Sequence, residues 1–252
     1  MSESVRLSAL IVAFNEADQI ERCLEALAFC DEIIVVDSES TDETVELARR
    51  FTDRVFVEPW RGYGGQKQFA LELCRGEWVL WIDADEVVSP ELARSIEAAV
   101  VSTSFRGYSV ARRVFYLGDW IRHGGWGKDW VLRLFRRETS RFRLDLVHEG
   151  VDLAGPIGKL SGPLDHYSYR SLSHHWSKID QFTSLWAEQR WESGKPARVG
   201  DLLFRPFGRW FKIYVLKQGW RDGWRGFVVA GLAAAYVLVK YAKLKEKEFR
   251  TP

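Results

Sequence analysis

Apolar runs alternate with helix-like segments over the first hundred residues. Four runs are short and rich in β-branched residues, as buried parallel strands are: LSALIVAFN from 7, DEIIVVDS from 31, DRVFVEP from 53 and EWVLWIDAD from 77. Each is followed by a segment that reads as a helix: EADQIERCLEAL, STDETVELARRF, GGQKQFALELC and SPELARSIEAAV. Four strand-helix alternations predict an α/β fold, a parallel sheet with helices on both faces.

Polar side chains gather where the predicted strands end. They are Asn15 and Glu16, Asp37 and Ser38, and Asp83 and Asp85. Ligands of such sheets bind at the carboxyl ends of the strands. Asp83 and Asp85 would point the same way in an extended segment, and a bound cation would offset their repulsion. The alternative is that DADEVVSPE only turns the chain and caps the helix that begins near Pro90.

The pattern changes after Val101. RGYSVARRVFYLGDW and WVLRLFRRE are strand-like and carry aromatic and arginine residues, with the loop HGGWGKD between them. FRLDLVHEGVDL follows, and then a long amphipathic segment, SLSHHWSKIDQFTSLWAEQRWESG. Most of the 12 tryptophans lie between Trp120 and Trp224. The two halves of the chain are therefore expected to differ in their chemistry.

The last fifty residues mix apolar, aromatic and basic side chains. The run from Phe227 to Val239 is almost wholly apolar, but a transmembrane helix needs about 20 such residues. Aromatic and basic residues at both edges are typical of a helix that lies in the membrane interface. The alternative is a helix packed on protein. The 201–245 segment is therefore expected either to lie in the interface or to pack on the rest of the chain.

Composition narrows the class of protein. The 252 residues, 46% of them hydrophobic, suffice for one large domain or a domain with an appendage. Lys plus Arg number 36 and Asp plus Glu 35, which argues against a nucleic-acid partner. The three cysteines, Cys23, Cys30 and Cys74, have no zinc-ligand spacing and are expected to be free thiols in a reducing cytosol. The first residues lack the features of a signal peptide, and none is expected.

Four motifs, in order, resemble glycosyltransferase family 2, whose nucleotide-sugar-binding fold is called GT-A. They are IVAFNEADQIERCLEAL, EIIVVDSESTDET, GYGGQKQFAL and WIDADE, which contains the family's Asp-x-Asp motif. The chain departs from the family at Ser38 and Glu39, where Asp-Gly is usual, and at Lys67 and Gln68, where Arg-Asn is usual. The resemblance implies a Rossmann-like sheet that binds a nucleotide sugar.

The resemblance also implies roles for individual residues. Asp85 is the expected ligand of a Mg²⁺ or Mn²⁺ ion, with Asp83 nearer the ribose or the waters of the metal and Ala84 between them. Asp37 is expected to accept a hydrogen bond from the nucleotide base. The remaining base-pocket candidates are Ala13, Asn15 and Glu16, with Lys67 reaching the base or the diphosphate. The alternatives are a helix cap at Asp37 and a solvated surface lysine at Lys67.

An inverting transferase needs a base that takes the proton of the acceptor hydroxyl. The family places an acid beyond the Asp-x-Asp strand, and here His148-Glu149 stands at that place. Glu149 is the expected base, Asp145 the reserve, and His148 a group that orients the base or contacts phosphate. A polar strand end is the alternative for this pair. His123 and His166 are candidates for a closing loop and a third metal position, or are structural histidines.

Over nearly its whole length the chain resembles bacterial lipopolysaccharide-core glucosyltransferases. This implies transfer of a sugar from a UDP-sugar to a lipid-linked inner-core acceptor at the cytoplasmic membrane surface. Glucose is the first candidate for that sugar. The expected division is a GT-A catalytic domain at 1–170, with a nucleotide-sugar half (1–101) and an acceptor half (102–170), and a helical, membrane-associating extension at 171–252. The enzyme is expected to be cytoplasmic and peripheral on the inner face of the membrane. Its oligomeric state stays open.

Other functions remain as alternatives. A transferase that uses a polyprenyl-phosphate-linked acceptor would share the membrane-bound, acidic character of the acceptor. A nucleotidyltransferase should carry a glycine-rich basic loop after the first strand, where this chain has VAFNEADQ. A non-catalytic membrane-associated scaffold should have lost the metal acids or the base, whereas Asp83, Asp85 and Glu149 are present.

Overall fold

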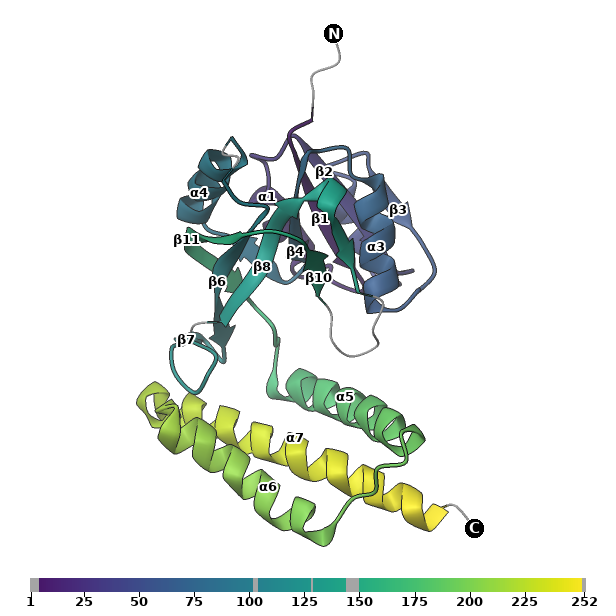
Figure 1. The fold of residues 1–252 in the computed structure, drawn as a ribbon, viewed down its shortest axis with the longest axis vertical. Helices are drawn as coiled ribbons and strands as arrows, with labels where there is room; N and C mark the ends of the chain where they lie inside the picture. Colours follow the sequence, from purple (N-terminus) through teal and green to yellow (C-terminus); the bar gives the residue numbers. More distant parts are fainter. Residues whose placement is uncertain (1–4, 102–103, 128, 144–149, 251–252) are drawn as a thin grey trace. The chain divides into compact units, whose positions relative to one another are not determined.

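The computed structural model describes residues 5–101, 104–127, 129–143 and 150–250 (Figure 1). The chain forms two compact units. The first comprises residues 1–112 and 130–166, and the second residues 113–129 and 167–252. The first unit holds the sheet with its flanking helices, and the second is mainly helical.

The first unit is built on a mixed sheet with the strand order β3-β2-β1-β4-β8-β6-β11-β5. Its strands are β1 (Leu7–Ala13), β2 (Glu32–Asp37), β3 (Val55–Val57), β4 (Trp78–Asp83), β5 (Glu86–Val88), β6 (Gly107–Tyr116), β8 (Asp129–Arg136) and β11 (Ile157–His166). The strands β3, β2, β1 and β4 pair in parallel, whereas β4 pairs antiparallel with β8. A separate antiparallel pair joins β9 (Ser140–Phe142) to β10 (Val151–Leu153), and a short 3₁₀ turn, η1 (Arg137–Thr139), precedes β9.

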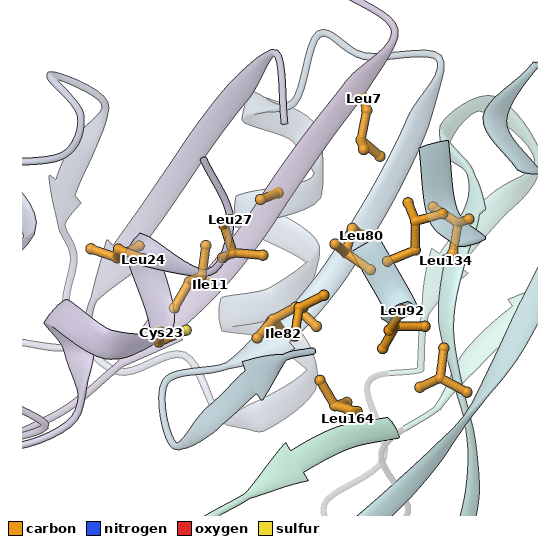
Figure 2. Packing of buried hydrophobic residues seen from close by; sticks show 14 of the residues in the cluster. Leu7, Ile11, Cys23, Leu24, Leu27, Leu80, Ile82, Leu92, Leu134 and Leu164 are labelled. Carbon is orange, nitrogen blue, oxygen red and sulfur yellow. The ribbon is translucent and has the colours of Figure 1, made fainter. Parts of the chain in front are cut away.

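The two faces of the parallel part carry two separate cores, because successive strand residues point to opposite faces. One core joins Leu7, Ile11 and Leu80 to the helices α1 (Ile20–Glu25), α2 (Thr44–Ala48) and α4 (Pro90–Val100). Figure 2 shows Leu24 of α1 and Leu27, which follows α1, in this core together with Leu92 of α4. The other core joins Leu10, Val79 and Trp81 to α3 (Tyr63–Leu73). The predicted α/β sheet with helices on both faces is therefore confirmed.

The chain between Asp83 and Pro90 is more structured than a plain turn. A turn at Ala84 and Asp85 leads into β5, which pairs antiparallel with β11. The α4 helix then begins at Pro90, and the Ser89 hydroxyl accepts a hydrogen bond from the Leu92 N–H. The segment holding Asp83 and Asp85 is thus not extended, so the two-residue alternation used in the sequence argument does not apply at Asp85.

The second unit contains three long helices, α5 (Leu172–Glu192), α6 (Val199–Phe211) and α7 (Gly223–Arg250). Two short helical segments, η2 (Lys212–Leu216) and η3 (Gly219–Asp222), connect α6 to α7, and β7 (Asp119–Ile121) pairs with the end of β6. One small core joins Ala187 of α5 to Tyr241 and Leu244 of α7. Among the described residues, the helical stretch Gly219–Phe249 is long and apolar enough to cross a membrane, with a mean hydropathy of 1.6 and 22% of its apolar window buried.

The three cysteines are free thiols, as expected. Cys23 and Cys74 are buried and Cys30 is partly buried. Burial raises the pKa of Cys74 to about 12 and raises the pKa of Cys23 and Cys30 well above the ordinary thiol value. A thiol with so high a pKa is a poor nucleophile at neutral pH, which fits a packing role.

Candidate active site

The register of the parallel strands brings three polar strand ends together. Ala13 at the end of β1 pairs with Asp37 at the end of β2. On the other side of β1, Val12 pairs with Asp83 at the end of β4. Asp37 and Asp83 therefore lie at the same edge of the sheet, separated by β1. This is the edge at which ligands bind in sheets of this kind.

A hydrogen-bonded chain links the ends of β1 and β2. The carboxylate of Asp37 accepts from the Ser40 backbone N–H at 2.7 Å and from the Ser40 hydroxyl at 2.5 Å. The Ser40 oxygen in turn accepts from the backbone N–H of Asn15 at 2.8 Å. Asn15 has a φ of 54°, which asparagine adopts more readily than most residues. Its side-chain oxygen accepts from the Thr41 N–H at 2.9 Å. The loop after β1 and the loop after β2 therefore hold each other in place.

Glu16 and Ala13 have mainly backbone roles in this chain of contacts. The Glu16 N–H donates to the Thr44 hydroxyl at 2.8 Å, and the Ala13 carbonyl accepts from the Ser38 N–H at 2.9 Å. Asp37 is fully buried and Ser38 is nearly so. The Asp37 carboxylate bonds to Ser40 three residues on, before the α2 helix begins, so it organises the loop that follows β2.

Lys67 is not a surface lysine. It lies in α3 and is buried, with its Nζ 3.8 Å from Asp83 Oδ1 and 4.3 Å from the centre of the Trp81 ring. The α3 helix begins after Gly62, whose φ of 80° suits glycine, and this places Lys67 in its second turn. A buried ammonium needs charge or ring partners, and Asp83 and Trp81 supply both.

Asp83 is held between two cations. Arg133 of β8 donates from Nη2 to Asp83 Oδ2 at 2.5 Å, whereas Lys67 is nearest to Oδ1. Burial alone would raise the pKa of Asp83, but the charges of Arg133 and Lys67 outweigh it and hold that pKa well below its usual range. Asp83 is therefore a permanent carboxylate. Its charge is already balanced by protein groups.

Glu86 supports this network through Arg133 and the Asp83 backbone. Its side chain is fully buried and accepts from Arg133 at 2.6 Å and from Arg112 at 3.3 Å. Its other oxygen accepts from the backbone N–H of Asp83 at 3.2 Å. The third acid of the DADE sequence is thus a structural ion-pair partner that fixes both Arg133 and the Asp83 backbone.

Asp85 has a different partner. Its Oδ2 lies 3.3 Å from Nε2 of His166, the last residue of β11. The pairing of β5 with β11, in which Glu86 opposes His166, positions this contact. Ala84 is buried between the two acids. The turn therefore directs Asp83 toward Lys67 and Arg133, and Asp85 toward His166.

The donor set at Asp85 suits a divalent cation that shares its coordination with a ligand. Among the described residues, no group of three or more His, Cys, Asp and Glu side chains is arranged to enclose a metal. A carboxylate and an imidazole are nevertheless in contact at Asp85 and His166. Mg²⁺ is usually held by one or two carboxylates together with phosphate oxygens and waters, so a two-residue site fits that chemistry.

Three of the sequence candidates lie outside the described residues, namely Asp145, His148 and Glu149. His123 belongs to the second unit, where its backbone N–H and its Nδ1 both contact the Asp222 carboxylate, at 2.8 and 2.9 Å. This pair fixes the start of the loop after β7. The described contacts of His123 are thus structural.

Sequence reasoning missed Arg133 and Gln66. Gln66 is buried and donates from Nε2 to the Ser38 hydroxyl and to the Glu58 carbonyl, both at 3.2 Å. Arg133 is one arginine within the apolar run VLRLF. That run carried a usable signal, since an arginine in a buried strand is almost never left without a partner.

Comparisons with known proteins identify the family of this chain. The model of the family described as "Glycosyl transferase family 2" matches residues 8–154. A lipopolysaccharide core biosynthesis glycosyltransferase, LpsC, of Rhizobium meliloti (strain 1021) is 36% identical over 255 residues, covering 98% of this chain and 94% of that protein. An uncharacterized glycosyltransferase of Rickettsia felis is 32% identical, covering 96% of this chain and 90% of that protein.

Solved structures identify the fold. The structure of S. aureus TarS 1–349 in complex with UDP-GlcNAc aligns with a TM-score of 0.51 at 14% identity, covering 97% of this chain and 92% of that one. At that identity the likeness establishes the GT-A fold alone. The sequence relatives and the family model go further, and the chain belongs to glycosyl transferase family 2 and is a glycosyltransferase.

Proposed function

We propose that this glycosyltransferase moves a sugar from a UDP-sugar to a lipid-linked saccharide of the lipopolysaccharide inner core, with inversion at the anomeric carbon. Glucose is the first candidate for that sugar. One observation carries the proposal: Asp37 at the end of β2 lies at the same sheet edge as Asp83 at the end of β4, which Asp85 follows, and the buried cation Lys67 is 3.8 Å from Asp83. The name of the Rhizobium meliloti relative supports the choice of acceptor. The UDP-GlcNAc complex of TarS supports a UDP-sugar as the donor class.

The donor contacts follow from the site. Asp37, with Ala13, Asn15 and Glu16 around it, would hold the base, and Lys67 would meet the diphosphate. Lys67 is well suited because Arg133 already neutralises Asp83, which leaves the ammonium with charge to share with a phosphate oxygen. Asp83, on the exposed side of this network, would accept from the ribose.

Asp85 and His166, with Asp83 nearby, are the residues that would hold a Mg²⁺ or Mn²⁺ ion. Such an ion offsets the negative charge that develops on a departing diphosphate. The protein's own contribution is to orient these donors, because β5 and β11 fix the turn that carries Asp85. Glu149 remains the proposed base for the acceptor hydroxyl, with Asp145 in reserve and His148 orienting the base.

Calorimetry with a panel of nucleotide sugars, first with Mn²⁺ and then with EDTA, tests the donor half of the proposal. We expect one UDP-sugar to bind with Mn²⁺ and to lose at least about tenfold in affinity with EDTA. Asp85→Asn should reproduce the EDTA result, whereas Asp53→Asn, an exposed acid in the loop before β3, should bind as the wild type does. A folded protein that binds no nucleotide sugar would contradict the proposal.

The acceptor half needs transfer assays with defined lipids. We expect radiolabelled sugar to appear on a lipid A–core acceptor and not on a polyprenyl phosphate. The reverse result would assign the chain to the alternative acceptor class, and Glu149→Gln separates binding from transfer in either case. That variant should bind donor normally and transfer at least about a hundredfold more slowly.

A further inference from the structure

Helix α6 and the segment that follows it expose a continuous apolar surface, which we call the α6 apolar face. Phe204 and Phe207 are its most exposed members, at 75% and 67%. Leu203, Phe207, Phe211 and Val215 recur every four residues, so they lie along one side of the helix. The full α6 apolar face consists of Leu203, Phe204, Phe207, Phe211, Val215 and Leu216.

This surface is not the packing side of α6. The side that meets α7 carries other residues: Leu202 joins the core around Tyr241, and the rings of Trp210 and Tyr214 meet Phe227 at 6.4 and 5.7 Å. Packing within the helical unit therefore already uses a separate side of α6. The α6 apolar face is left exposed to solvent, which costs free energy unless another surface covers it.

Basic residues alternate in sequence with the residues of the α6 apolar face. Between 201 and 225 the chain has six basic residues and two acidic ones, namely Arg205, Arg209, Lys212, Lys217, Arg221 and Arg225 against Asp201 and Asp222. Both acids are already paired, Asp201 with Arg205 and Asp222 with His123. Trp220 and Trp224 are exposed beside them, and tryptophan favours the level of lipid headgroups.

The positive charge near the α6 apolar face favours a negatively charged partner. A second copy of the chain would bring the same positive charges against it, and like charges across an interface oppose association. An anionic bilayer offers negative headgroups for basic residues such as Arg209 and Lys212, and an acyl boundary for the phenylalanines. The combination of an apolar side with basic residues therefore fits a phospholipid surface.

The contacts of α7 argue that the helix lies beside the bilayer and does not cross it. Its Lys243 reaches the Asp180 carboxylate of α5 at 2.7 Å, and its Lys247 reaches Glu188 of α5 at 3.0 Å. Lys240 of α7 has its Nζ 4.5 Å from the centre of the Trp186 ring of α5. A spanning α7 would carry the charged α5 helix with it into the hydrocarbon, where each charge is costly.

We propose that the α6 apolar face docks in plane on an anionic membrane, with the phenylalanines in the acyl boundary and the basic residues on lipid phosphates. The proposal names the surface that holds the enzyme near its lipid-linked acceptor. The biological purpose of the docking rests on the proposed function. The docking itself depends on the second unit alone and requires no donor, metal or acceptor.

Flotation of the full chain with vesicles tests the proposal. The vesicles are phosphatidylcholine alone, or phosphatidylcholine mixed with phosphatidylglycerol. We expect binding to the mixed vesicles, weakened by salt, and at least about tenfold weaker partitioning for F204S/F207S. The matched control is L172S/L185S, which removes two leucines of α5 that are 47% and 49% exposed, and it should change partitioning by less than about twofold.

A second variant separates charge from burial. R209E/K212E should lose at least about tenfold on mixed vesicles and change little on phosphatidylcholine alone. Circular dichroism melting checks that each variant is folded. The proposal is overturned if the wild type ignores both vesicles, if F204S/F207S binds as tightly as the wild type, or if that variant abolishes a dimer while vesicle binding persists. Retention of F204S/F207S in membranes washed with alkaline carbonate would show a spanning α7 and would also overturn it.

Failure here is distinguishable from failure of the proposed function. Donor calorimetry on F204S/F207S reports the site at the sheet edge, whereas flotation reports the helical unit. Normal donor binding with lost flotation supports both proposals. Normal donor binding with unchanged flotation overturns the docking proposal alone.

Discussion

Arg133 Nη2 lies 2.5 Å from Asp83 Oδ2, which joins the middle of β8 to the end of β4. The same nitrogen is 2.6 Å from the buried Glu86 carboxylate, and the guanidinium carbon is 4.1 Å from the Trp81 ring centre. The first Asp of the Asp-x-Asp motif is therefore oriented and charge-balanced by protein groups before a ligand arrives. The second, Asp85, has its Oδ2 3.3 Å from Nε2 of His166.

Removing the Arg133 charge should destabilise the fold. Arg133→Met removes one of the two arginines that contact the buried Glu86 and one of the two cations beside Asp83, at a cost of about 3 kcal/mol or more in the free energy of unfolding. Urea denaturation measures this cost. Arg143→Met is the control, because it breaks the exposed Arg143–Asp152 pair, and such pairs contribute about 1 kcal/mol or less. Equal losses in the two variants would contradict the assigned role of Arg133.

Lys67 should contribute to donor affinity more than to stability. Lys67→Met keeps the side-chain volume and leaves Asp83 paired with Arg133, so we expect at least about tenfold weaker UDP-sugar binding by calorimetry. Lys159→Met is a matched control, since Lys159 also lies over a tryptophan, with its Nζ 4.6 Å from the Trp130 ring centre. A normal dissociation constant for Lys67→Met would remove Lys67 from the donor site.

Asp37 and Ser40 should behave as a coupled pair. Asp37→Asn replaces an acceptor of two hydrogen bonds from Ser40, and Ser40→Ala removes the hydroxyl that links Asp37 to Asn15. Each change should lower the free energy of unfolding by about 1–2 kcal/mol. The double variant should lose less than the sum, by about 0.5 kcal/mol or more, as groups in direct contact do. Strict additivity in urea denaturation would show that the two residues act independently.

His166 should affect metal affinity through its contact with Asp85. His166→Gln should weaken Mn²⁺ binding in the presence of UDP by about 10–100-fold, the range found when a supporting or ligating partner is lost. Electron paramagnetic resonance of free Mn²⁺ measures this without turnover. His123→Gln serves as the comparison, because His123 contacts Asp222 in the second unit, and it should leave Mn²⁺ affinity unchanged.

His175 should make the fold sensitive to acid. Burial, with smaller contributions from Lys178 and His174, lowers the pKa of His175 from 6.5 to about 4, and its Nδ1 is 2.7 Å from the Tyr116 hydroxyl oxygen. Between these two pKa values the unfolded chain binds a proton that the folded chain does not. The free energy of unfolding should thus be level above the higher value and fall by about 2 kcal/mol by pH 5.

His175→Gln provides the control for that pH dependence. The variant keeps a polar side chain beside Tyr116 but does not titrate, so its unfolding free energy should vary less with pH than that of the wild type. Tryptophan fluorescence in urea follows the transition, because Trp126 stacks on Tyr169 beside His175. Parallel curves for the two proteins would assign the acid sensitivity to other groups.

The alternation of apolar runs and helical spacing was enough to predict the parallel strands, their helices and the sheet edge that carries both Asp37 and Asp83. Those features follow from local periodicity and from the rule that parallel strands share a carboxyl edge. The four motifs in order were enough to predict the family, which the family model and the relatives confirm.

The partners of the charged residues required the tertiary structure. Arg133 is 50 residues from Asp83 along the chain, and His166 pairs with Asp85 through the antiparallel contact of β5 with β11. No local pattern encodes such distances, because strand order and register are set by how whole faces pack. The sequence by itself determined which acids stand at the strand ends. The tertiary structure alone decided that Asp83 meets two buried cations and that Asp85 meets a histidine, since a buried charge needs a partner and these partners come from other helices and strands.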